Sequence, residues 1–98
     1  MRPVHPGEVL REDYLAETGM SVNALAKHLK VPTPRLNDVI LERRGISADT
    51  ALRLARYFDT TPEFWLNLQA SFDLKVAAGK VGDTITREVQ PRSQLVER

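Results

Sequence analysis

The stretch SVNALAKHLKVPTPRLNDVILERRG, residues 21–45, decides how this chain folds. Its first half repeats apolar residues at the spacing of one helix face. These are Val22, Leu25, Ala26 and Leu29. The second half does the same with Leu36, Val39 and Ile40. Ser21 stands just before the first apolar residue, where its hydroxyl is predicted to cap the helix. The pattern predicts two short amphipathic helices.

A tight turn is predicted between these two helices. Pro32 lacks an N–H and disfavours helical geometry at Val31, so the first helix is expected to end there. Thr33 is a predicted N-cap, and Pro34 then falls at the first helical position, where a missing donor costs nothing. Two helices joined in this way are typical of a DNA-binding helix-turn-helix, whose second helix enters the major groove.

Positive charge is concentrated in this stretch, although the whole chain of 98 residues carries a net charge of only +1. Residues 21–45 contain five bases and two acids, a net +3, whereas residues 1–20 contain two bases and four acids, a net −2. Binding to DNA needs local positive charge, because each neutralised phosphate releases condensed counterions. The charge distribution therefore supports a DNA-facing surface on residues 21–45.

Composition limits the remaining possibilities. The chain is 42% hydrophobic and has no cysteine, which indicates one modest core without disulfides or thiol chemistry. No apolar run could span a membrane and no signal peptide is recognisable, so a cytoplasmic protein is expected. His5 and His28 lack partners at metal-ligand spacing, so each is expected to be hydrogen-bonded or exposed. We predict no catalysis, no metal, no cofactor and no small-molecule substrate.

Three further helices are predicted around the central pair. One begins at Pro6 and ends at Gly19, one is capped by Ser47, and the last opens at Thr61-Pro62. The predicted fold is therefore all-α, with a five-helix helix-turn-helix DNA-binding domain over residues 1–77. Beyond residue 77 the pattern weakens, and residues 78–98 are predicted to be a tail that is a short strand, a partner-binding arm or disordered.

Three motifs carry a resemblance to a known family. They are HPGEVLREDYL from His5, SVNALAKHLKVP from Ser21 and RRGISADTALRLARYFDTTPEFWLNLQASFDLKVA from Arg43. Together they resemble the HigA (VapI-type) antitoxins, which belong to the lambda-repressor-like, Xre-type helix-turn-helix proteins. The resemblance implies a five-helix dimer that represses its own operon and neutralises a HigB-type toxin, similar to the RelE group of mRNA endonucleases. The alternatives are a stand-alone Xre-type transcriptional regulator and, more distantly, an interaction module that no longer binds DNA.

The candidate DNA contacts form two groups. Base readers are expected on the second helix of the pair: Thr33, Arg35, Asn37 and Asp38. Phosphate contacts are expected from Ser21, Asn23, Lys27, Arg43 and Arg44. For Asp38 the role is either to accept from a cytosine amino group or to pair with a nearby arginine. The competing interpretation of the whole set is an ordinary solvated surface. A dimer on a palindromic operator is expected, because one reading helix covers few base pairs.

Two other surfaces are candidates for protein partners. Trp65, Leu66 and Leu74 form a candidate dimer face if they are exposed on the last helix, whereas Phe64 and Phe72 are expected in the core. Acids of the first helix form a candidate docking surface for a basic toxin. These are Glu8, Glu12, Asp13 and Glu17. A solvated helix face is the alternative for the acids, and the C-terminal tail is the other candidate for toxin binding.

Overall fold

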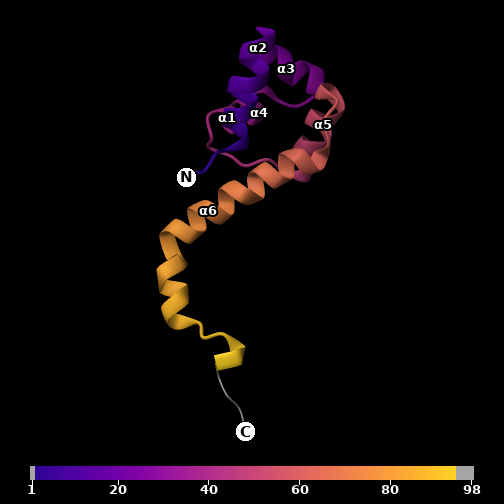
Figure 1. Cartoon of the computed structure of the whole chain (residues 1–98). Helices are drawn as coiled ribbons and strands as arrows, with labels where there is room; N and C mark the ends of the chain where they lie inside the picture. The colour runs from indigo at the N-terminus through magenta and orange to yellow at the C-terminus, as the bar shows by residue number, and fades with distance from the viewer. Residues whose placement is uncertain (1, 95–98) are drawn as a thin grey trace.

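The computed structural model describes residues 2–94, which fold into five helices and contain no strand (Figure 1). The first helix runs without a break through α1 (Pro6–Val9), the π-helical η1 (Leu10–Leu15) and α2 (Ala16–Thr18). The others are α3 (Val22–Leu29), α4 (Thr33–Ile40), α5 (Ala48–Phe58) and α6 (Pro62–Glu88), followed by a 3-10 turn, η2 (Arg92–Gln94). The predicted all-α, five-helix fold is confirmed.

Three of the predicted helix N-caps and the predicted end of the first helix are in place. Ser21, Ser47 and Thr61 each accept a hydrogen bond from the backbone amide three residues further along the chain. Gly19 ends the first helix in the left-handed conformation, with φ of 71°. These caps pair backbone groups that a helix end otherwise leaves without a partner.

The start of α4 differs by one residue from the prediction. α4 begins at Thr33 and its cap is Pro32, whose carbonyl accepts a hydrogen bond from the amide of Arg35 at 3.1 Å. Pro34 therefore takes the second helical position, where an amide is also without a helical partner. α3 ends before the proline, because Lys30 adopts a left-handed conformation with φ of 60°. The Thr33 hydroxyl is left for another contact.

The core lies where the first helix, α3, α4 and α5 meet, and the N-terminal part of α6 closes it (Figure 1). Its apolar residues are Leu10, Leu15, Leu25, Ala26, Leu29, Val31, Leu36, Val39, Ile40, Ile46, Ala51, Leu54, Ala55 and Trp65. Leu25, Leu36 and the other apolar positions predicted from residues 21–45 are in this set, apart from the half-buried Val22. Helical periodicity was therefore a sound guide to burial in the central pair.

His5 caps the start of the first helix and packs against α6. His5 is buried, and its Nδ1 accepts a hydrogen bond from the amide of Gly7 at 2.9 Å. Its ring meets Phe72 of α6 edge-on, with centroids 4.8 Å apart. Burial lowers the pKa of His5, which favours the neutral ring that this cap requires. The expectation of a hydrogen-bonded His5 is confirmed, and among residues 2–94 no cluster of His, Cys, Asp and Glu suits a metal ion.

Trp65 anchors α6 in the core. Its side chain is 0% exposed, and the indole Nε1 donates to Thr60 Oγ1 at 2.9 Å. The prediction that Trp65 belongs to an exposed dimer face is wrong, because the core of the monomer encloses its ring. Phe64 was expected in the core but is 38% exposed, because it lies outside Trp65 with the ring centroids 5.0 Å apart.

α6 extends far beyond the core and gives the molecule an elongated shape of 62 × 22 × 21 Å (Figure 1). The helix continues to Glu88, so the short-strand alternative for this part of the tail is wrong. Gly79 and Gly82 do not interrupt it, since glycine inside a helix costs only about 1 kcal/mol relative to alanine. No break marks the predicted domain boundary at residue 77, which stays a prediction, and residues 95–98 of the predicted tail lie outside the described residues.

No helix of residues 2–94 combines the length and the hydrophobicity that crossing a membrane requires.

Candidate nucleic-acid interface

α4 has one buried side and one outward side. Leu36, Val39 and Ile40 hold the buried side in the core. At about 100° per residue, the opposite side carries Pro34, Asn37, Asp38 and, just past the helix end, Leu41. Sequence analysis did not assign Leu41 to this side, and its side chain is exposed. We call these four residues the reading face.

The N-terminal turns of α3 and α4 are joined beside the reading face. Thr33 Oγ1 donates a hydrogen bond to Asn23 Oδ1 at 2.8 Å. The bond leaves the two N–H donors of the Asn23 amide and an acceptor site on the Thr33 hydroxyl available. Because both helix N-termini lie here, their dipoles add positive potential that attracts phosphate. The predicted base contact and the predicted phosphate contact are therefore direct neighbours.

Arg35 has a different contact from the predicted one. Its Nη2 donates to Asp49 Oδ1 at 3.1 Å and to Thr50 Oγ1 at 2.7 Å, and the side chain is 30% exposed. Helical spacing places it next to the buried Val39 and not on the reading face. The guanidinium therefore ties α4 to the N-terminus of α5. Base reading by Arg35 stays a prediction that requires these bonds to break.

Asp38 gathers two arginines at the far end of the reading face. Its Oδ1 accepts from Arg43 Nη2 at 2.8 Å and from Arg43 Nε at 3.2 Å. Arg44 Nη2 lies 3.9 Å from Asp38 Oδ2. This is the arginine pairing that sequence analysis gave as one of two roles for Asp38. Two cations and one anion leave a positive end to the face, and both guanidinium groups remain more than half exposed.

The remaining predicted phosphate contacts lie on α3. Ser21 Oγ accepts from the amide of Ala24 at 3.1 Å, so its own hydroxyl proton is free to donate. Lys27, six residues after Ser21, is exposed.

The predicted acidic surface of the first helix is partly neutralised. Both Nη groups of Arg2 hold Glu8 at 2.8 and 2.6 Å, and this hydrogen bonding lowers the pKa of Glu8. Glu12 accepts from the preceding arginine at 3.1 Å. Asp13 and Glu17 are exposed and form no ion pair within residues 2–94. Only the later part of this surface keeps uncompensated negative charge.

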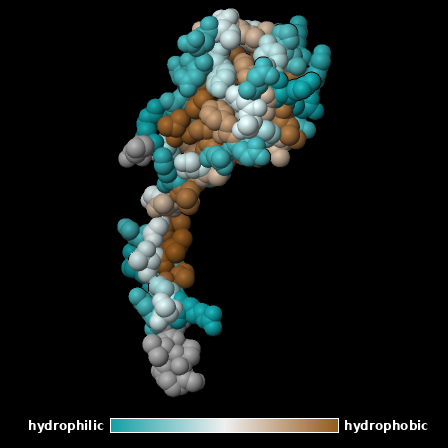
Figure 2. Space-filling view, turned by 45° about the vertical axis from the view of Figure 1, so that its right-hand side comes forward, coloured by the Kyte–Doolittle hydropathy of each residue, from teal (hydrophilic) through white to brown (hydrophobic). Residues whose placement is uncertain are grey.

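Figure 2 shows hydrophobic residues along one side of the protruding part of α6. Leu74 is 71% exposed, and it begins a series spaced by three or four positions. The series, here called the α6 stripe, is Leu74, Ala78, Val81, Ile85 and Val89. Leu66 is only half-buried and packs against the core. The apolar spacing is present in the sequence, but Gly79 and Gly82 suggested that the helix ends before it, so these residues were not assigned to one helix face.

Comparisons with known proteins agree with this geometry. A family model described as Helix-turn-helix matches residues 10–65, which include α3 and α4. Virulence-associated protein I of Dichelobacter nodosus is 54% identical over 77 residues, covering 79% of this chain and 71% of that protein.

Two solved structures share nearly the whole fold. The antitoxin GraA is 56% identical with a TM-score of 0.91, over 93% of this chain and 98% of that chain. The Pseudomonas aeruginosa antitoxin HigA, solved with the higBA promoter, is 50% identical with a TM-score of 0.91, over 93% of this chain and 99% of that chain.

Proposed function

This chain belongs to the HigA family of helix-turn-helix antitoxins, and from that premise we propose that it is a DNA-binding antitoxin and autorepressor. It binds a palindromic operator in its own promoter as a homodimer, and it neutralises a HigB-type mRNA endonuclease by direct contact. The family is not a class of enzymes, so catalysis in the system belongs to the toxin.

The reading face of α4 is the observation that carries the proposal. It presents the polar side chains of Asn37 and Asp38, with arginines at one end and the N-termini of α3 and α4 at the other. The match to a HigA solved with promoter DNA extends over both helices of the pair. This arrangement suits a helix that lies in the major groove with cations on the flanking phosphates.

Each residue has a proposed role. Asn37 makes a bidentate contact to adenine, and Thr33 reads a neighbouring base edge. Asp38 orients Arg43 and Arg44 toward phosphates, or accepts from a cytosine amino group. Ser21, Asn23 and Lys27 contact phosphates on the other side of the groove. Arg35 positions α5 against α4 and supports the reading face from behind.

We expect Asn37→Ala to weaken binding to the native operator by about tenfold or more, because a bidentate base contact contributes on the order of 1–3 kcal/mol of discrimination. Binding to a scrambled duplex should change little. Fluorescence anisotropy with both duplexes at one fixed salt concentration measures the effect. Asn67→Ala, at an exposed position of α6, is the matched control. An equal loss on the two duplexes would remove Asn37 from base reading.

The α6 stripe is the proposed dimer interface, in place of the face with Trp65. An exposed apolar series on a helix without a covering element is expected to pair. Its spacing by three and four residues suits packing against the same helix of a second copy, as in a short coiled coil. Leu74 remains in the interface, whereas Leu66 contributes at its edge.

The double substitution Leu74→Asp and Ile85→Asp is expected to convert the dimer to a monomer, because both charges would be buried without partners. Sedimentation equilibrium would then give half the wild-type mass, and operator binding would weaken with it. Leu52→Asp places a charge on another exposed leucine, away from the stripe, and should leave the mass unchanged. A dimer that survives the double substitution would require another interface.

Toxin binding is proposed at Asp13 and Glu17, the acids of the first helix without ion pairs. Co-expression with the upstream reading frame, followed by pull-down and growth rescue, tests this proposal. We expect Asp13→Asn with Glu17→Gln to weaken capture of a basic toxin, since complementary charge promotes association.

If the neighbouring frame encodes no small basic RelE-like protein, the stand-alone Xre-type regulator replaces the antitoxin proposal. If the wild-type protein does not bind its own promoter, both the antitoxin-autorepressor proposal and the stand-alone regulator are contradicted.

A further inference from the structure

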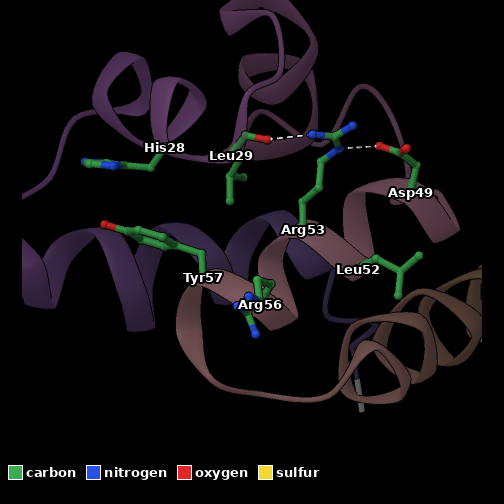
Figure 3. Close-up of a pocket in the computed structure, with 7 residues that line it drawn as sticks. All are labelled: His28, Leu29, Asp49, Leu52, Arg53, Arg56 and Tyr57. Carbon is green, nitrogen blue, oxygen red and sulfur yellow. Dashed lines mark hydrogen bonds and ion pairs between the residues drawn. The ribbon is translucent and has the colours of Figure 1, made fainter.

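A groove of about 630 Å³ lies between α3 and α5, outside the reading face and the α6 stripe (Figure 3). Leu29 and His28 come from the end of α3, and Leu52, Arg53 and Tyr57 come from the outer side of α5. This volume falls within the range of roughly 300–1,000 Å³ that is usual for small-molecule sites. None of the functions proposed above uses these side chains.

One wall of the groove is apolar and aromatic. The His28 ring lies over the Tyr57 ring, with centroids 5.1 Å apart and planes 20° from parallel (Figure 3). Leu52, five residues earlier on the same helix, is 60% exposed at the other end of the groove. A planar ring laid against the open side of the His28–Tyr57 pair would bury apolar surface there.

The α5 side of the groove also carries two guanidinium groups, which differ in their contacts. Arg53 is held rigidly, since its Nε donates to Asp49 Oδ1 at 2.7 Å and its Nη1 to the carbonyl of Leu29 at 2.9 Å (Figure 3). Its Nη2 has no acceptor within residues 2–94. Arg56 is exposed at the groove and forms no hydrogen bond or ion pair within the same residues.

The charge of the groove is not cancelled by its one acid. The Asp49 carboxylate oxygen that pairs with Arg53 also accepts from Arg35 of α4, so it is shared by two cations. Both arginines lower the pKa of Asp49 and keep it ionised. Arg53 and Arg56 therefore leave unused donors beside an aromatic wall. Guanidinium donors favour carboxylates, which they bind through parallel hydrogen bonds.

We propose that this groove binds a small carboxylate-bearing ligand with a planar aromatic body. The ring packs against the His28–Tyr57 pair, and the carboxylate accepts hydrogen bonds from Arg53 Nη2 and from Arg56. Binding requires both parts of the ligand, because the open groove offers little apolar area by itself and exposed charge pairs contribute little alone.

Titration of ¹⁵N-labelled full-length protein with indole-3-acetate tests the proposal. We expect saturable shifts of backbone amide signals confined to the end of α3 and to α5. Tryptophol keeps the indole ring without the carboxylate, and acetate keeps the carboxylate without the ring. Each should bind at least about tenfold more weakly, which corresponds to the loss of one charge-assisted contact or of the buried ring. Equal binding of tryptophol or acetate would overturn the proposal.

Arg56→Gln is the informative variant, because an exposed side chain without partners can be replaced without loss of folding. It should weaken indole-3-acetate binding about tenfold, whereas Arg87→Gln at an exposed position of α6 should have no effect. The proposal is contradicted if Arg56→Gln binds as the wild type does. It is equally contradicted if the wild type gives no saturable shifts up to about 10 mM ligand, a limit that corresponds to negligible affinity.

Discussion

Gly7→Ala is expected to lower the free energy of unfolding by about 3 kcal/mol or more, or to prevent folding. A Cβ at this position would lie 2.0 Å from the carbonyl oxygen of Val39 and 2.9 Å from its carbonyl carbon. Both atoms belong to the backbone of α4, which cannot rotate away as a side chain can. The first helix would have to move off α4 and open the core. Urea denaturation followed by circular dichroism measures the change.

Gly79→Ala provides the matched control for this substitution. Gly79 also lies in a helix, but nothing is within 4 Å of the added Cβ. Alanine there should stabilise α6 by about 0.5–1 kcal/mol, because it lowers the backbone entropy lost on folding. If Gly7→Ala unfolds at the same urea concentration as the wild type, the close approach of the first helix to α4 is refuted.

Trp65→Ala is expected to destabilise the protein by about 3–5 kcal/mol, the usual cost of removing a fully buried large aromatic side chain. The variant also leaves the Thr60 hydroxyl without its indole partner. Since small domains are stable by only about 5–15 kcal/mol, much of the population would unfold at elevated temperature. Thermal unfolding followed at 222 nm measures the loss.

Phe64→Ala is the comparison that isolates burial from residue type. Phe64 is adjacent in sequence, also aromatic and partly exposed, so its truncation should cost clearly less than that of Trp65. If the two variants melt together, or if Phe64→Ala is the less stable, the assignment of Trp65 to the core is incorrect. Loss of dimerisation by Trp65→Ala would follow from unfolding and would not indicate an interface.

Much of the DNA-reading part could be predicted from sequence because its signals are local. Ser21 and Gly19 act on backbone groups within a few residues, so their identity is enough to place helix ends. Apolar spacing identified Leu25 and Leu36 as core residues for the same reason. The predicted start of α4 was wrong by one residue, because threonine suits both the N-cap and the first helical position, and proline suits both the first and the second helical position.

Contacts between distant segments could not be read from the sequence. Nothing near Arg35 in the chain indicates that its guanidinium reaches Asp49 and Thr50 of α5. The groove at Tyr57 could not be predicted either, since its residues come from α3 and α5, and the whole of α4 separates these helices in the sequence. Local sequence patterns indicate which residues are buried or exposed on a helix, but they do not indicate which distant residue each side chain contacts.

The sequence by itself determined the five helices, the Ser21 cap of the central pair and the concentration of positive charge on residues 21–45. Only the tertiary structure decided that Trp65 is buried while Phe64 is exposed, and that α6 carries an uncovered stripe past residue 77. The physical reason is that helix formation and capping depend on neighbours along the chain. Burial depends on where the other helices lie, and two adjacent aromatic residues about 100° apart on one helix have different surroundings.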